Sequence, residues 1–293
     1  MAVTITPSGK RPVVASITTD FAVRDIGIED LRIALRQGWD DFLTMRGDLV
    51  FLGLVYPAVV ILAALYMLEN SVVSLVFPLF SGAVLLGPAA ASGFYELARR
   101  REQGLDTRWR HFFDVFRPSS PAFPSLAALT TITAVLFILW IGAASMIYAA
   151  TLGHGQPVSM NDFLRTSMMS VGDLAPRQPA SFSAFVRELF TTPAGWTMIV
   201  VGNVVGLLFA ATTLAISVVS FPMLVDRPRI GWEVALRTSV RVTRRNPGTV
   251  AVWGLIVVAL LVLGSIPAFV GLAVVLPVLG YATWHLYTRA VER

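Results

Sequence analysis

Long apolar stretches interrupt this chain, and they constrain its fold more than any other feature of the sequence. Five such stretches occur in 293 residues, and none carries an acidic or basic residue in its central part. A helix that crosses the hydrocarbon core of a bilayer needs about 20 consecutive apolar residues. Charged residues are only 14% of the chain, whereas they are about a quarter of an average soluble domain. The sequence therefore predicts an all-α integral membrane protein.

The apolar stretches divide into six membrane spans. The segment 248–287 contains no Asp, Glu, Lys or Arg, and as a single helix it would be about twice as long as the core is thick. The sequence Gly264-Ser265-Ile266-Pro267 near its middle predicts a turn, so this segment is expected to be a tight hairpin of two spans. The other spans are expected at 49–68, 72–98, 126–151 and 195–225.

Basic residues are concentrated in alternate gaps between the spans. Among the 23 Lys and Arg residues, only Arg165, Arg177 and Arg187 lie in a gap on the other side. Cytoplasmic loops of membrane proteins carry an excess of Lys and Arg. We therefore expect both termini in the cytoplasm, a loop at 152–193 outside and, in a cell with two membranes, a location in the inner (cytoplasmic) membrane. The basic pI of 10.1 follows from the same rule and does not indicate binding to nucleic acid.

An amphipathic segment precedes each odd-numbered span. In these segments apolar residues recur at steps of three and four, as on one face of a helix that lies at the membrane surface. They are Ile28, Leu31, Leu35, Trp39 and Phe42 in the first, with Asp41 on its polar side; Leu105, Trp109, Phe112, Phe113 and Phe116 in the second; and Trp232, Leu236 and Val240 in the third. Each unit is expected to be an interfacial helix followed by a helical hairpin.

Three parallel repeats of this unit account for the order of the segments. The repeats are expected at about 27–103, 104–229 and 230–293, within a six-helix membrane domain at 23–293. Residues 1–22 are expected to form a disordered cytoplasmic tail without a cleavable signal peptide, and 152–193 an extracytoplasmic insertion in the second repeat. Because every copy begins and ends in the cytoplasm, an axis along the membrane normal relates them.

Candidates for lining a cytoplasm-facing cavity lie on the even-numbered spans. They are Pro88, Glu96, Asn203, Pro222, Pro277 and His285. The prolines kink their helices, and such kinks either wrap the bundle or shape a cavity. Asn203 either bonds a neighbouring helix or contacts a substrate. Glu96 and His285 each follow a proline by eight residues, so they either lie separately at the interface or face each other as a carboxylate and an imidazole.

Motifs for catalysis, metal binding and nucleotide binding are missing. The sequence has no Cys, three separate His residues and a single Lys. These counts exclude thiolate metal sites, disulfides and phosphate-binding loops that end in Gly-Lys-Ser/Thr. Ion-coupled carriers usually need a charged residue deep in a span, and none is present. We expect no enzymatic activity, no cofactor and no metal site.

Basic residues beside the spans are expected to contact the anionic headgroups of lipids, with about 1 kcal/mol for each cation near the surface. They are Arg99, Arg100, Arg101, Arg108, Arg110, Arg244 and Arg245. The loop at 152–193 either docks a partner membrane protein or lies on the bilayer.

Three segments carry a resemblance to a known family: GIEDLRIALRQGWDDF at 27–42, GPAAASGFYELARRREQG at 87–104 and GWEVALRTSVRVTRRNP at 231–247. With them and its pattern of spans, the chain resembles over about 25–290 a bacterial family of six-span integral membrane proteins, domain of unknown function 2189. The resemblance implies a six-span fold and a location in the inner membrane. It implies no activity, substrate or site residues.

Two classes of function remain open. The first is a non-catalytic accessory, assembly or organising component of a membrane complex, which the charge-free spans and the aromatic interfacial segments favour. The alternative is a transporter, channel or lipid-handling protein with a cavity along the axis of the three repeats, which the internal repeats, the prolines and Asn203 favour. We prefer the first, because carriers usually depend on ionisable groups within the membrane.

Overall fold

The computed structural model describes residues 21–45, 84–152, 182–267 and 269–293. The first expected span, the first part of the second (72–83), nearly all of the N-terminal tail and most of the expected outer loop lie outside these residues. Over the described ranges the chain is helical, and its β structure is an isolated antiparallel bridge between Val23 and Val291. The all-α prediction is confirmed for this part of the chain.

Within each described range, the helices follow one another with short connections. After a helix at 28–45 come η1 (Val84–Leu86), α3 (Gly87–Ala90), α4 (Ser92–Glu102), η2 (Trp109–Phe116), α5 (Phe123–Thr151), α7 (Phe182–Thr191), α8 (Pro193–Ser217), α9 (Ser220–Asp226), α10 (Trp232–Arg245), α11 (Pro247–Ser265) and α12 (Leu272–Ala290).

Three of the described helical segments are long and apolar enough to cross a membrane, namely α5, α8 together with α9, and α11. They match the expected third, fourth and fifth spans, and each starts within three residues of the expected position. Pro193 and Pro247 stand at the first position of α8 and α11. The first turn of a helix tolerates proline because its N–H groups have no partner within the helix. These starts are therefore encoded locally in the sequence.

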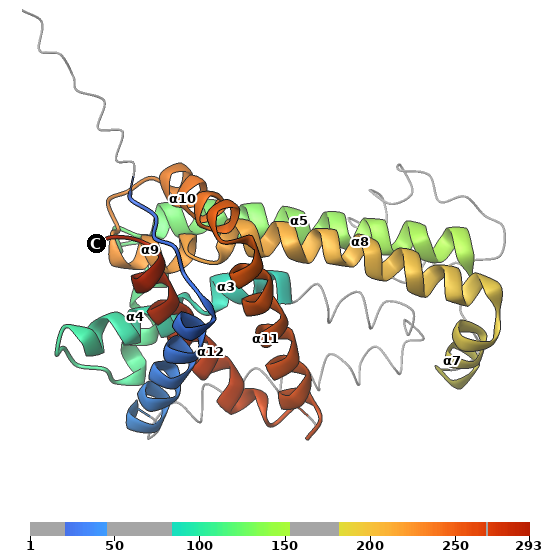
Figure 1. Ribbon diagram of the computed structural model, residues 1–293, viewed down its shortest axis with the longest axis horizontal. Coiled ribbons are helices and arrows are strands. Elements are labelled where there is room, and N and C mark those ends of the chain that lie inside the picture. Colours follow the sequence, from blue (N-terminus) through green and yellow to red (C-terminus); the bar gives the residue numbers. More distant parts are fainter. Residues whose placement is uncertain (1–20, 46–83, 153–181, 268) are drawn as a thin grey trace, which may run out of the picture.

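The helices form two divergent pairs that share one packed end (Figure 1). α5 and α8 lie side by side along the long axis of the molecule, and α11 and α12 form the second pair. At the shared end, α4, α9 and the last part of α12 pack against one another. The N- and C-terminal described segments meet there as well, where Arg24 N donates to the Ala290 carbonyl at 2.9 Å.

The packed core lies where α4, α9 and α12 meet. Tyr281, Trp284 and Tyr287 of α12 are each 0% exposed, and Phe221 and Leu224 of α9 belong to the same cluster. Large side chains therefore fill the space between these three helices. By contrast, α5, α8 and α11 expose long apolar faces, as expected for helices whose solvent is lipid.

Each amphipathic segment packs on one of these three helix ends. Helix 28–45 lies on α12, and Gly38 permits the close approach, because a Cβ there would lie 2.6 Å from the Ala282 nitrogen. η2 packs on α4, with the Phe112 ring against Gly93. α10 packs on α9 and on the end of α8. The expected helices at 28–42 and 232–245 are thus present and bury one face.

The second amphipathic segment is a 3-10 helix, so the predicted steps of three and four were wrong there. η2 buries Phe112 and Val115, which are three residues apart, and exposes Phe113 and Phe116. Three residues per turn place residues i and i+3 on the same side of such a helix. Leu105 lies before the helix and is exposed.

The prolines of the even spans occupy two kinds of position. Pro88 lies in the first turn of α3, and Pro222 lies in the first turn of α9, after a break at the end of α8. Pro277 alone of the three lies inside a longer helix, α12. At the first two positions the chain ends one helix and begins another rather than bending a single helix.

Candidate functional site

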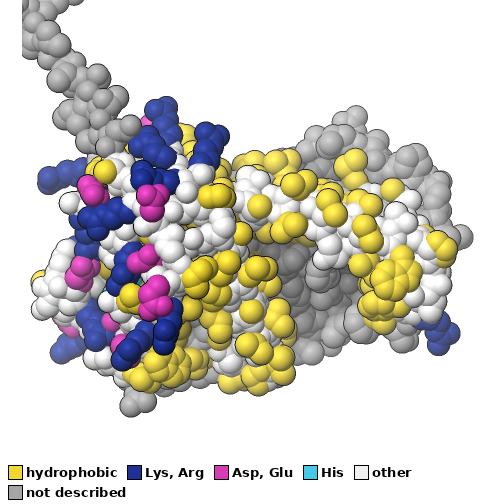
Figure 2. All heavy atoms as spheres, in the orientation of Figure 1, with side chains coloured by type: hydrophobic (Ala, Val, Ile, Leu, Met, Phe, Trp, Pro, Cys, Tyr) yellow, Lys and Arg dark blue, Asp and Glu magenta, His cyan; other side chains and the backbone are white. Residues whose placement is uncertain are grey.

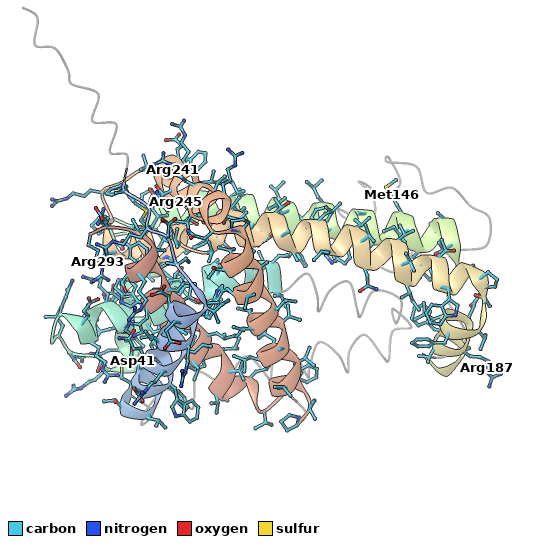
Figure 3. The ribbon with its side chains drawn as sticks, viewed as in Figure 1. Asp41, Met146, Arg187, Arg241, Arg245 and Arg293 are labelled. Carbon is cyan, nitrogen blue, oxygen red and sulfur yellow. The ribbon has the colours of Figure 1, made fainter. Side chains whose placement is uncertain are left out.

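Charged side chains gather at the packed end of the molecule, whereas apolar side chains cover the helices that extend from it (Figure 2). Arg187 of α7 lies at the opposite end (Figure 3). Exposed aromatic residues occur at both ends of the long apolar helices. Trp39 and Trp109 lie on the short helices of the charged end, and Trp196 lies at the start of α8. Aromatic belts of this kind mark the two interfaces of a membrane.

Asp41 joins three helices at the charged end. Its side chain, on helix 28–45, accepts hydrogen bonds from Arg101 of α4 and from His285 Nε2 of α12, the latter at 2.9 Å. Asp41 is only 7% exposed. The apolar periodicity of helix 28–45 predicts that Asp41 lies on its polar side, and this prediction is wrong, because the buried face runs through Leu31, Gly38 and Asp41. This cluster has no sequence motif.

The hydroxyl of Tyr281 lies one turn before His285 on α12. It is buried and has no hydrogen-bond partner among the described residues. The ring packs edge-on against Phe94 of α4, with centroids 5.8 Å apart. The ring of Tyr281 therefore contributes apolar packing between α4 and α12.

Glu96 is the centre of a second network. The side chain is 5% exposed and accepts hydrogen bonds from Arg99 at 2.9 and 2.7 Å and from Arg100 at 2.7 Å. Arg100 also donates to Asp114 of η2 at 3.0 Å, and Asp114 accepts from His111 Nδ1 at 2.6 Å. The network fixes η2 to α4.

A small cavity of about 130 Å³ lies beside this second network. It is lined by Glu96, Arg99, Asp114, Val115, Ser120, Pro121, Ala122, Val225 and Pro228. A water molecule takes about 30 Å³ of liquid, so the space suits a few waters. Both carboxylates are already bound to arginine, and the cavity therefore offers little to a larger ligand.

The six candidate cavity residues do not surround that cavity. Glu96 is the one residue of the six that lines it. Pro222 and Pro277 are buried in packed helices. Asn203 is exposed on α8, and its Nδ2 donates at 2.7 Å to the carbonyl of Ile199 in the same helix. Glu96 and His285 do not pair, because Glu96 binds arginines of α4 and His285 binds Asp41.

Most arginines expected at lipid headgroups bind carboxylates of the protein. Arg99, Arg100 and Arg101 do so as described above, and Arg245 makes a bidentate pair with Asp25 at 2.6 and 2.8 Å. Arg108 and Arg110 lie 3.8 and 2.9 Å from Asp106. Arg244 is the exception, for it is exposed and makes no hydrogen bond or ion pair with the described residues. Arg36, Arg229 and Arg237, which are not among the arginines predicted to contact headgroups, share this property.

Two exposed carboxylates have pKa values held below the ordinary range. Hydrogen bonding from the Arg245 side chain lowers the pKa of Asp25. The backbone N–H of Arg108 lowers the pKa of Asp106, and hydrogen bonds from His111 and Arg110 add to this effect. Both groups therefore stay ionised at neutral pH. Within the described ranges no cluster of three or more His, Asp or Glu residues is suited to a metal ion.

Charged side chains are confined mainly to one end, exposed aromatic residues lie at both ends of the long helices, and those helices expose apolar faces. Together these features define an all-helical integral membrane protein. The chain belongs to the family of predicted integral membrane proteins called domain of unknown function 2189 (DUF2189), whose model matches residues 76–175 and 167–226, together more than half of the chain. This confirms the family that the sequence segments resemble. Comparison with curated proteins and with solved structures finds no match.

Proposed function

We propose that the chain crosses the inner membrane of a bacterium six times, as three parallel repeats with both termini in the cytoplasm. The order of packing supports this organisation, since helix 28–45 lies on α12, η2 on α4 and α10 on α9. Each segment thus contacts the end of the even-numbered span of the preceding repeat, and the first contacts the last. Contacts that run from each repeat to the next and from the last back to the first are expected for equivalent units arranged around one axis.

The distribution of arginine supports the proposed orientation. The charged end contains the described basic residues of the N-terminal segment, of the two expected cytoplasmic loops and of the C-terminal segment, whereas Arg187 lies at the other end (Figure 3). An excess of basic residues marks the cytoplasmic side.

Within this membrane the protein acts as a non-catalytic accessory, assembly or organising component of a complex. The observation that carries this inference is the packed centre of α4, α9 and α12, where Tyr281, Trp284 and Tyr287 are each 0% exposed. An axial route for a transported substrate would reach the cytoplasm at this place. Opening it would expose large side chains whose burial stabilises the fold by roughly 2 kcal/mol each.

The charged groups support the same conclusion. Asp41 and Glu96 are the buried carboxylates of the described chain. Asp41 binds Arg101 of another helix, and Glu96 binds Arg100, which in turn donates to Asp114 of η2. Ionised groups of a carrier or an enzyme have to be free for substrate or proton during turnover. A rigid cytoplasmic end instead suits a protein that presents a fixed surface to others.

Purification from native membranes tests this function. The full chain, tagged and expressed at its natural level, is isolated in mild detergent, and the associated proteins are identified by mass spectrometry and size analysis. We expect a second membrane protein in constant stoichiometry. A lone monomer or homo-oligomer that retains a specific small molecule would instead favour the transporter alternative.

Asn203→Ala provides a matched test of that alternative. The Asn203 amide bonds only its own helix among the described residues, so its loss leaves packing between helices unchanged. We expect the variant to keep the partner and the protein level of the wild type. Loss of a transport phenotype at normal protein level would contradict the organising role.

A further inference from the structure

The arginines of α10 divide into two groups according to whether they bind a partner within the described chain. Arg245 is bound to Asp25, and Arg241 donates to the Phe21 carbonyl at 3.4 Å. Arg237 and Arg244 are exposed and bond nothing in the described chain. Seven residues separate these two, which places them on one face, about 10 Å apart along the axis. That face lies opposite the buried residues Ala235, Thr238, Ser239 and Val242.

α10 is held beside the start of α5, the end of α8 and the start of α11. Before its start, the Ile230 carbonyl accepts a hydrogen bond from Ser125 in the first turn of α5, at 3.2 Å. At its other end, Asn246 alone separates it from α11. Between these points the Ser239 hydroxyl donates to the Ala215 carbonyl near the end of α8, at 2.9 Å. Two hydrogen bonds and the one-residue connection to α11 hold α10 against the ends of three helices long enough to cross a membrane, so we infer that α10 lies along the surface of the bilayer.

The free arginines therefore lie at the depth of lipid headgroups. In Figure 2, basic side chains extend along the edge of the charged end near α10, next to the apolar surface of α5 and α8. Among the described residues within the sequence of α10, Glu233 is the one acidic group, and it makes no ion pair with either arginine. Uncompensated cations within a Debye length of a membrane attract anionic lipids.

We propose that the outer face of α10, through Arg237 and Arg244, binds the phosphate headgroups of anionic phospholipids on the cytoplasmic leaflet. The inference rests on the orientation argued under the proposed function and adds a partner that the organising role does not require. Guanidinium groups suit this ligand because they donate two parallel hydrogen bonds to phosphate oxygens. Arg229, exposed in the turn before α10, extends the same surface.

The test compares lipid retention by two double variants of the full chain. Arg237→Gln/Arg244→Gln removes the proposed contacts, and Arg108→Gln/Arg110→Gln removes the same charge from exposed residues that already bind Asp106. Purified protein is titrated with phosphatidylglycerol or phosphatidylcholine of the same acyl chains, and native mass spectrometry counts the bound lipid. We expect the wild type to prefer phosphatidylglycerol. The α10 variant should lose roughly 30-fold of that preference, the equivalent of about 1 kcal/mol for each cation, and the control should keep it.

Three results would overturn the proposal: a wild type without preference, equal losses in both variants, or displacement of phosphatidylglycerol by excess inorganic phosphate or by RNA. Equal losses would mean that net charge alone attracts the lipid, and displacement would mean that the face binds a free anion or a nucleic acid. These outcomes are separable from a failure of the organising role, because the retained partner protein is measured in a different experiment.

Discussion

At the scale of single residues, Asp41 connects three helices of the charged end. Asp41→Asn removes the charge that binds Arg101 of α4 and weakens the bond to His285 of α12. Leaving a charged, partly buried hydrogen-bonding group without its partner costs about 1 to 3 kcal/mol. We expect a lower Tm for the purified variant, measured by thermal unfolding in detergent. Asp40→Asn is the matched control, because Asp40 is the adjacent residue and is exposed. Equal losses of Tm would mean that Asp41 acts only through net charge.

The pair of Asp25 and Arg245 predicts a specific dependence of stability on pH. Hydrogen bonding to Arg245 holds the pKa of Asp25 below its ordinary value of 3.8 in the folded state. Ionised Asp25 therefore stabilises the fold above that value, and this contribution is lost as pH falls through the lower, folded-state pKa. We expect Asp25→Asn to have a slightly lower Tm than the wild type at pH 7, with the difference vanishing in acid. Because the pair is exposed, high salt should reduce the difference as well. A difference that grows in acid would refute the assignment.

At the scale of elements, the contact of helix 28–45 with α12 depends on the absence of a side chain. A Cβ at Gly38 would lie 2.6 Å from the Ala282 nitrogen and 2.8 Å from the Val278 carbonyl oxygen, both backbone atoms that cannot move alone. Gly38→Ala gains up to about 1 kcal/mol of helix propensity but loses about 1 to 3 kcal/mol to overpacking. We expect a net loss of stability in thermal unfolding. Gly248→Ala in α11, where a Cβ meets open space, should be neutral or stabilising. A stabilised Gly38→Ala would show that the two helices are not in close contact.

Local signals in the sequence predict the elements but not their partners. The starts of α8 and α11 follow from apolar runs that begin at a proline, and Thr192 caps α8 by accepting from Gly195 N at 2.9 Å. The 3-10 form of η2 escaped prediction, because a short aromatic segment fits periods of three and of four equally well. Asp41 and His285 are 244 positions apart, and no pattern in the sequence indicates that their helices meet. Glu96 and His285 were predicted as a candidate pair because each follows a proline by eight residues. In the fold they lie in separate hydrogen-bond networks.

At the scale of the whole molecule, the N-terminal described segment is hydrogen-bonded to the C-terminal segment and to the turn between α10 and α11. Glu292 N donates to the Ala22 carbonyl at 3.0 Å, and Asn246, between α10 and α11, accepts from Ile26 N at 2.9 Å and donates to the Arg24 carbonyl at 3.1 Å. The segment before helix 28–45 is thereby fixed to the last repeat proposed here. We expect Asn246→Ala to lower the Tm by more than Thr131→Ala, since within the described ranges the Thr131 hydroxyl bonds only the Ala127 carbonyl of its own helix. Leaving the buried Ile26 N–H without an acceptor costs about 1 to 3 kcal/mol. Comparable Tm values would show that the two ends are stable without this tie.

The orientation of the molecule in the membrane can be tested without altering any native cysteine, because the chain has none. Glu233→Cys on α10 and Arg187→Cys on α7 each introduce one exposed thiol, at the charged end and at the opposite end of α8. A membrane-impermeant maleimide added to intact cells should label the thiol at 187, and it should label the thiol at 233 only after the membrane is permeabilised. The reason is the excess of arginine at the end that carries α10, which favours retention of that end in the cytoplasm. The cysteine-free parent controls for labelling of other proteins. Labelling at 233 in intact cells would reverse the orientation, and with it the leaflet in which Arg237 and Arg244 meet lipid headgroups.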